Sequence, residues 1–158
     1  MSDKVKLFLE DAFFIIDEKI KNGGEITFSP KGVSMLPLIR PGLDSVVLKK
    51  ADGTLKKGDI AFYRRDNGKF VLHRVIEVKN GFYRMCGDNQ IYVEKKVEDR
   101  HIIAVVKEVL RDGKAVDFGS FKYKLYLKML VLKRFGKKLF STVYIKAVLR
   151  RIKKIFNK

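Results

Sequence analysis

The sequence predicts an α+β protein, in which a mostly antiparallel β body follows an N-terminal amphipathic helix and precedes a basic helical tail. Apolar residues recur at three- and four-residue spacing over residues 3–21, and helical spacing returns from about residue 121. Short strand-like runs separated by turn signals fill the middle of the chain. We therefore divide it into residues 1–24 (helix), 25–118 (β-rich domain) and 119–158 (tail).

The composition is that of a folded protein without a disulfide framework. The chain has 158 residues, of which 46% are hydrophobic and 34% charged, enough for one domain with a buried core. The single cysteine, Cys86, excludes an internal disulfide and a cysteine-rich zinc site. With only two histidines, His73 and His101, a histidine-rich metal centre is not expected either. We predict no metal site and no cofactor.

The charge is concentrated in the tail. The net charge is +17, yet no acidic residue follows Asp117, whereas thirteen of the 35 Lys and Arg residues do. The first 121 residues therefore carry 22 basic and 18 acidic side chains, a net charge of only +4. Such a basic block indicates an anionic partner, either a membrane surface or nucleic acid, unless the tail packs on the domain with a solvated basic face.

The first expected element is a helix over residues 3–21. Its apolar residues lie on one side, with Ser2 as the N-cap and Asn22-Gly23-Gly24 as the end signal. We expect it to pack on the domain, or alternatively to bind a partner or a membrane surface. The repeating positions are Val5, Phe8, Leu9, Ala12, Phe13, Ile16 and Ile20.

The β body is predicted as short strands joined by tight turns. Asp66-Asn67-Gly68 and Asn80-Gly81 are strong hairpin signals on either side of the longest strand. Regular spacing of such strands favours a compact, mostly antiparallel sheet or barrel. The expected strands are Glu25–Phe28, Ser45–Leu48, Ile60–Tyr63, Phe70–Val78, Phe82–Cys86, Ile102–Val106, Val109–Leu110 and Ala115–Val116.

The tail resembles an interfacial amphipathic helix, because lysine and arginine fill the face opposite its apolar stripes. Gly136 and Ser141-Thr142 are expected to break it into two helices. Charged residues interrupt every apolar run well before the roughly 20 residues that a spanning helix needs. We therefore expect the chain not to span a membrane and to act in the cytoplasm, or peripherally on the inner membrane face. The stripes are Leu125, Met129, Leu132, Leu139 and Val143, followed by Leu149, Ile152 and Phe156.

Two residues are candidates for chemistry, Ser34 and His73. Ser34 lies between two turn formers, Gly32 and Pro37, and a serine hydroxyl is a weak nucleophile until a neighbouring base takes its proton. His73 is one of few candidate bases, within a strand that reads as half-buried. Taken singly, each also fits a structural role, as a turn serine and a core histidine.

The order of five segments favours the catalytic interpretation. Their succession resembles the conserved boxes of type I signal peptidases, within the superfamily that includes the self-cleaving repressor proteases. The resemblance runs from about residue 27 to residue 106, roughly half of the chain. The segments are Gly32–Pro37, Leu43–Val47, Lys57–Phe62, Val71–Ile76 and Cys86–Gln90.

This resemblance implies roles for particular residues. Ser34 would be the nucleophile, with backbone amides at Ser34 as the oxyanion hole and Gly32, Met35 and Pro37 shaping the loop. His73 stands where many members have a lysine base, which is similar to the Ser-His branch found in the endoplasmic reticulum, archaea and sporulating bacteria. Asp88 would orient His73, and Glu94 is the alternative acid.

The implied function is a serine endopeptidase that removes a signal or leader peptide from a precursor. Members usually carry a hydrophobic anchor before the serine segment, whereas this chain has the charged amphipathic helix there. The expected partner is a protein or leader-peptide substrate, with an anionic membrane surface contacted through residues 121–158. The alternative is a non-catalytic or regulatory module that binds nucleic acid or a membrane through the basic tail, nucleic acid being the less favoured of the two.

Overall fold

The structure is a computed structural model that describes residues 13–133, and the chain divides into two compact units, Met1–Val116 and Asp117–Lys158. In the first unit, residues 13–21 form a helix, which is the described part of the helix expected over residues 3–21. Asn22 and Gly23 end it, with Gly23 at φ 79° as expected of a helix-terminating glycine. The predicted N-cap, Ser2, lies outside the described residues.

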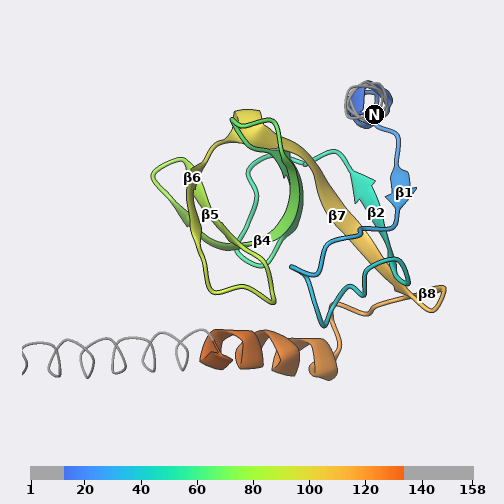
Figure 1. The fold of residues 1–158 in the computed structure, drawn as a ribbon, viewed down its shortest axis with the longest axis vertical. Helices are drawn as coiled ribbons and strands as arrows, with labels where there is room; N and C mark the ends of the chain where they lie inside the picture. Colours follow the sequence, from blue (N-terminus) through green and yellow to red (C-terminus); the bar gives the residue numbers. More distant parts are fainter. Residues whose placement is uncertain (1–12, 134–158) are drawn as a thin grey trace, which may run out of the picture. The chain divides into compact units, whose positions relative to one another are not determined.

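The β body is one antiparallel sheet with strand order β1-β2-β7-β3-β4-β5-β6, and β8 pairs with β7. Viewed as in Figure 1, β4, β5 and β6 curl round into a ring that one end of β7 helps to close. The α+β, mostly antiparallel class predicted from the sequence is confirmed. The strands are β1 Ile26–Phe28, β2 Ser45–Lys49, β3 Ile60–Arg64, β4 Phe70–Lys79, β5 Phe82–Cys86, β6 Glu94–Val97, β7 Ile102–Arg111 and β8 Lys114–Ala115.

Two hairpins set the positions of the functional residues. The turn between β3 and β4 closes through a hydrogen bond of 2.9 Å from Arg65 N to Lys69 O, which places Ala61 opposite His73. The next hairpin places Arg74 opposite Cys86. Because successive side chains of a strand point to opposite faces, His73 and Arg74 lie on different sides of β4.

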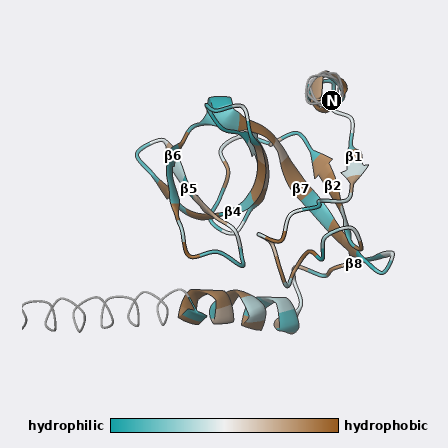
Figure 2. Ribbon diagram, viewed as in Figure 1, coloured by the Kyte–Doolittle hydropathy of each residue, from teal (hydrophilic) through white to brown (hydrophobic). Residues whose placement is uncertain are grey.

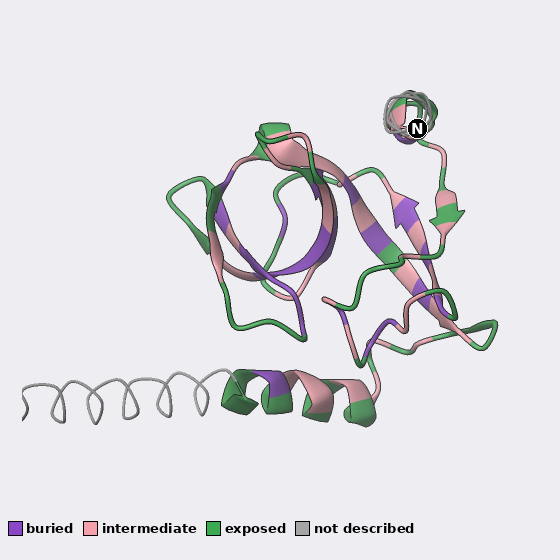
Figure 3. Cartoon of the chain, in the orientation of Figure 1, coloured by how far each residue is buried: buried purple, intermediate pink, exposed green. Residues whose placement is uncertain are grey.

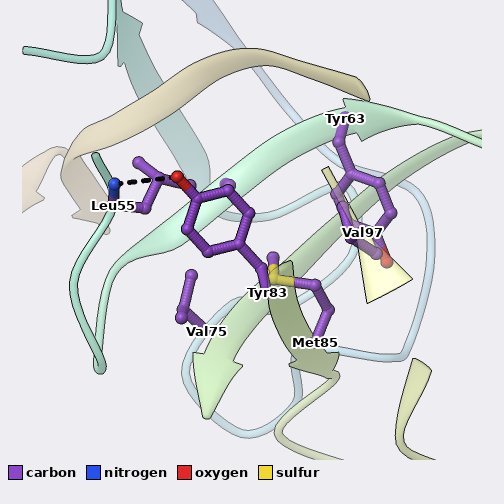
Figure 4. Packing of buried hydrophobic residues seen from close by; sticks show 7 residues of the cluster. Leu55, Tyr63, Val75, Tyr83, Met85 and Val97 are labelled. Carbon is purple, nitrogen blue, oxygen red and sulfur yellow. Dashed lines mark hydrogen bonds between the residues drawn. The ribbon is translucent and has the colours of Figure 1, made fainter. Parts of the chain in front are cut away.

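The interior of the curled sheet is filled from β3, β4, β5 and β6. Figure 3 shows the buried stretches on the strands, and Figure 2 shows that β4 and β7 carry much of the apolar colour. Two buried tyrosines lie among aliphatic side chains in this cluster (Figure 4), and the Tyr83 hydroxyl accepts a hydrogen bond of 3.3 Å from Leu55 N. The cluster is Leu55, Ala61, Tyr63, Val75, Tyr83, Met85 and Val97.

Two strands differ from the sequence prediction. β6 was not predicted, because its sequence Glu-Lys-Lys-Val lacks an apolar alternation; charged residues are common on edge strands, which present unpaired backbone groups. β7 was predicted as two strands separated by Lys107-Glu108, but it is continuous. The register shifts there, with Val47 opposite Glu108 and Leu48 opposite Val106, so Lys107 is the extra residue of a β-bulge.

In the second unit, residues 121–133 are helical, and an exposed apolar stripe runs along one face. The exposed fractions are 79% for Phe121, 47% for Leu125, 59% for Met129 and 69% for Leu132. Within residues 13–133, no helix has the length and apolarity that crossing a membrane requires. The predicted break at Gly136, the second predicted helix and its stripe lie outside the described residues.

Candidate active site

Ser34 lies on a compact turn, residues 34–38, that follows β1. Two buried side chains, one within the turn and one directly after it, anchor it: Met35 is 2% exposed and Ile39 is 0% exposed, and Ile39 N donates a 3.0 Å hydrogen bond to Met35 O. The peptide bond between Leu36 and Pro37 is cis. Ser34 itself is only half-buried, so the turn holds its hydroxyl at an accessible place on a fixed backbone.

A buried carboxylate braces the end of this turn. Asp44 is fully buried, accepts a hydrogen bond of 2.7 Å from Arg40 N and pairs with the Arg40 guanidinium at 2.6 Å. These hydrogen bonds hold the pKa of Asp44 below its usual range, so it stays charged at neutral pH. Arg111 also donates a 3.1 Å hydrogen bond to Pro37 O. The serine turn is therefore tied to β2 and β7.

The Gly-Asp-Asn segment packs directly against Ser34. Asn89 N donates a 2.8 Å hydrogen bond to Ser34 O, and Asn89 Nδ2 lies 3.4 Å from Val33 O. A Cβ added at Gly87 would lie 2.6 Å from Ser34 O and 3.0 Å from Ser34 Cβ. Glycine is thus the residue that allows the two backbones to approach so closely, and this segment sets the position of the serine.

His73 and Ser34 line the same groove. His73, on β4, is 4% exposed. Gly32, Met35 and a wall of three aromatic side chains also line the groove. In that wall the ring centroids of Phe28 and Phe62 are 5.6 Å apart, and those of Phe62 and Phe70 are 5.7 Å apart. The structure therefore brings the predicted nucleophile and base into one groove with an aromatic wall.

One ring nitrogen of His73 is used inside the fold. Its Nδ1 lies 3.2 Å from the Tyr63 hydroxyl, which donates a 2.9 Å hydrogen bond to Glu94 Oε2. Glu94 is ion-paired with Arg65 at 2.6 Å. Since Nδ1 is engaged and the side chain lines the groove, Nε2 is the nitrogen that is left to face the groove.

Burial disfavours the charged form of His73. Removal from water, followed by the positive charge of Arg65, lowers the pKa of His73 from 6.5 to about 4, although Glu94 and Asp88 act in the opposite direction. At neutral pH the imidazole is therefore uncharged, which is the state that a general base requires.

Asp88 and Glu94, the two candidate acids, have different partners. Asp88 is 1% exposed and forms a bidentate pair with Arg74, at 2.9 Å to Nε and 2.7 Å to Nη2, while Arg74 Nη1 donates to Gly58 O. This pair fixes the Gly-Asp-Asn segment to β4. Glu94, the alternative acid, is connected to the imidazole of His73 through Tyr63, whereas Asp88 is ion-paired with Arg74.

Tyr63 is the residue that sequence reasoning missed. A signal for it was available, because the Asp66-Asn67-Gly68 turn fixes the hairpin register and a residue two positions from Ala61 shares the face of His73. Of the predicted loop residues, Gly32 and Met35 line the groove. The carbonyl oxygen of Pro37 instead accepts a hydrogen bond from Arg111. Among the described residues there is no cluster of His, Cys, Asp and Glu that could hold a metal ion.

Comparisons with known proteins identified no relative. No protein-family model matches the chain, and searches of the curated proteins and of the solved structures found no similar protein. The function is therefore argued from the residues of the groove.

Proposed function

We propose that the protein is a serine endopeptidase of the signal peptidase-like type, in which Ser34 is the nucleophile and His73 is the general base. The observation that carries this proposal is that Ser34 and an uncharged, buried His73 line one groove. The packing of Gly87 and Asn89 against Ser34 supports it, because a nucleophile must be held within a fraction of an ångström of its productive position.

The proposed reaction consists of acylation of Ser34 followed by hydrolysis of the acyl-enzyme. Ser34 Oγ attacks the carbonyl carbon of the scissile peptide bond while His73 Nε2 takes the hydroxyl proton, and the oxyanion is bound by backbone N–H at Ser34. The tetrahedral intermediate then collapses, the C–N bond breaks, and Nε2 gives its proton to the leaving amine. Water, deprotonated by the same nitrogen, finally hydrolyses the acyl-enzyme to release the acid and restore Ser34.

The groove supports a peptide substrate with an apolar side chain near the cleaved bond. Its wall of Phe28, Phe62 and Phe70 offers aromatic surface beside Ser34, and burying an apolar side chain there contributes about 1.5–3 kcal/mol to binding. Lys31 and Arg65 also line the groove and give it basic positions for polar groups of the peptide. A hydrophobic signal or leader segment has this chemistry.

The test is cleavage of a proteome-derived peptide library, read by mass spectrometry as new peptide ends. We expect a defined set of cleavages for the wild type and none for Ser34→Ala or His73→Ala. Ser45→Ala is the matched control. Ser45 lies on β2, its hydroxyl is hydrogen-bonded to that of Ser29 at 2.8 Å, and it does not line the groove. A cooperative thermal unfolding transition is required of each variant as evidence that it folds. Equal cleavage by Ser34→Ala and the wild type would refute the assignment.

We also propose that residues 121–133 bind an anionic membrane surface, so that the peptidase acts peripherally on the inner membrane face. The specific observation is the exposed stripe of Phe121, Leu125, Met129 and Leu132, four residues spaced along one helical face. Exposed lysines at 122, 124 and 128 flank it, and no acidic residue follows Asp117 in the sequence. An apolar face flanked by cations suits lipid with negative headgroups.

Co-sedimentation with vesicles tests this second proposal. We expect binding to vesicles that contain about a third of phosphatidylglycerol, a loss of at least tenfold in the Leu125→Gln/Met129→Gln variant, and little binding to neutral phosphatidylcholine. Val131→Gln is the matched control, because Val131 is 44% exposed but lies off the stripe. Binding to DNA with no binding to anionic vesicles would refute the proposal in favour of a nucleic-acid partner.

A further inference from the structure

A partly buried chain of hydrogen bonds connects the imidazole of His73 to Tyr63, Glu94 and Arg65. His73 Nδ1 lies 3.2 Å from the Tyr63 hydroxyl, and this hydroxyl lies 2.9 Å from Glu94 Oε2. Arg65 then holds the carboxylate, with Nη2 at 2.6 Å from Oε2 and Nε at 3.0 Å from both oxygens. Tyr63 is 0% exposed, and its ring belongs to the core cluster of Figure 4.

The chemistry of these groups determines the direction of each bond. A carboxylate that is paired with a guanidinium has only acceptor sites, so the single proton of the Tyr63 hydroxyl is donated to Glu94. The Tyr63 oxygen can then only accept a hydrogen bond from His73. Consequently the proton of the neutral imidazole lies on Nδ1, and Nε2 carries the lone pair.

We propose that Tyr63 and Glu94 are positioning residues that hold His73 in the Nδ1-protonated tautomer, with Nε2 free to act as the base for Ser34. This inference deepens the proposed function and rests on it for its catalytic meaning, whereas the tautomer itself is a property of the resting protein. In the alternative tautomer, Nε2 would carry a proton and could not accept one from a serine hydroxyl.

The arrangement differs from a carboxylate placed directly on the imidazole. The phenol separates the negative charge of Glu94 from His73, and Arg65 offsets that charge, so the ring stays neutral in the resting state. Burial, followed by the hydrogen bond to Glu94, raises the pKa of Tyr63, and it therefore keeps its proton throughout the working range. When Nε2 takes the serine proton, the resulting imidazolium donates more strongly from Nδ1 to the Tyr63 oxygen, with no proton moving beyond His73.

The direct test is the protonation state of each ring nitrogen, measured by nitrogen-15 NMR on protein labelled at histidine, in which only His73 and His101 contribute signals. At pH 7 we expect a protonated Nδ1 and an unprotonated Nε2 for His73. In Glu94→Gln, the side-chain amide can donate to the Tyr63 oxygen and release the phenol proton to Nδ1, so the tautomer should reverse. In Tyr63→Phe the preference should be lost.

Matched controls separate this effect from a general disturbance. Tyr83→Phe removes the hydroxyl of the other buried tyrosine of the same core cluster, and Glu77→Gln removes a carboxylate that pairs with Arg84. Neither residue contacts His73, so its nitrogen signals should not change. Because Tyr63→Phe removes a core hydroxyl and risks failing to fold, the wild-type spectrum and Glu94→Gln are sufficient by themselves to decide the question.

Cleavage kinetics provide the second readout. We expect Tyr63→Phe and Glu94→Gln to lower kcat by between about ten- and 10⁴-fold with KM unchanged, the upper figure being the loss when an amide replaces the orienting carboxylate of a serine protease. A wild-type His73 protonated at Nε2, or variants with unchanged tautomer and kcat, would overturn the inference. The expected tautomer in a protein that cleaves no peptide would instead refute the proposed function alone.

Discussion

Replacing Gly87 by alanine tests whether the Gly-Asp-Asn segment sets the position of the serine. The new Cβ would meet Ser34 O at 2.6 Å, and ordinary van der Waals contact begins at 3.4 Å, so the two segments must separate by about 0.8 Å. Both atoms that it meets on Ser34, O and Cβ, are part of or fixed to the backbone, and no rotamer change can relieve the contact. Overpacking of this kind costs about 1–3 kcal/mol of stability.

The same displacement moves the proposed nucleophile, and a shift of about 1 Å at a catalytic group lowers the rate by roughly 10²-fold. It would also strain the 2.8 Å hydrogen bond from Asn89 N to Ser34 O. We therefore expect Gly87→Ala to lower kcat/KM for peptide cleavage by about two orders of magnitude while the chain still folds. Urea denaturation measures the stability and the peptide assay measures the rate.

Gly32→Ala is the matched control, with the same chemical change in the loop before Ser34. A Cβ at Gly32 would have nothing within 4 Å, and neither glycine has a positive φ, so backbone strain does not distinguish them. We expect Gly32→Ala to leave the free energy of unfolding within about 0.5 kcal/mol of wild type. Because Gly32 lines the groove, it is a control for stability and not for cleavage. If Gly87→Ala left both stability and cleavage at the wild-type values, the segment would not be positioning the serine.

Two further predictions concern the buried charges. Because the pKa of His73 is about 4 in the folded protein and about 6.5 in the unfolded chain, peptide cleavage should be constant from pH 6 to 8 and half-maximal near pH 4. Between pH 4 and pH 6.5 the imidazole is protonated in the unfolded chain but not in the folded protein, so the free energy of unfolding should fall by roughly 3 kcal/mol as the pH decreases from 6.5 to 4. Urea denaturation at several pH values measures this decrease, and an equal decrease in His73→Gln would contradict the burial argument. Asp88→Ala should lower the free energy of unfolding by about 3–5 kcal/mol, because it removes one partner of a buried ion pair. Asp52→Ala, which removes one partner of the exposed Lys49–Asp52 pair, should lower it by less than about 1 kcal/mol. Equal losses in urea denaturation would show that burial of the Asp88 pair does not matter for stability.

The strands were predictable where burial imposes an alternation on the sequence. β2 alternates half-buried and buried positions, and hairpin turns delimit β4, so the pattern and the punctuation agree. β6 offers neither signal, since only its last residue, Val97, is buried; what holds it is pairing with β5. The continuity of β7 depended on a bulge at Lys107, which arises from tertiary pairing with β2 and leaves no mark in the local sequence.

The candidate site shows a sharper limit: the sequence predicted two residues that line one groove, Ser34 and His73, but for the acid it named Asp88 with Glu94 as the alternative. Neighbouring residues on β4 point to opposite faces, and this alternation gives the two candidate acids different partners. Arg74 stands opposite Cys86, so Asp88, two residues further on, meets Arg74. Tyr63 lies two residues from the partner of His73 and reaches its imidazole. The registers of the two hairpins place Tyr63 on the face of His73 and Asp88 on the face of Arg74, whereas matching segments by type favours Asp88 over Glu94 as the acid that orients His73.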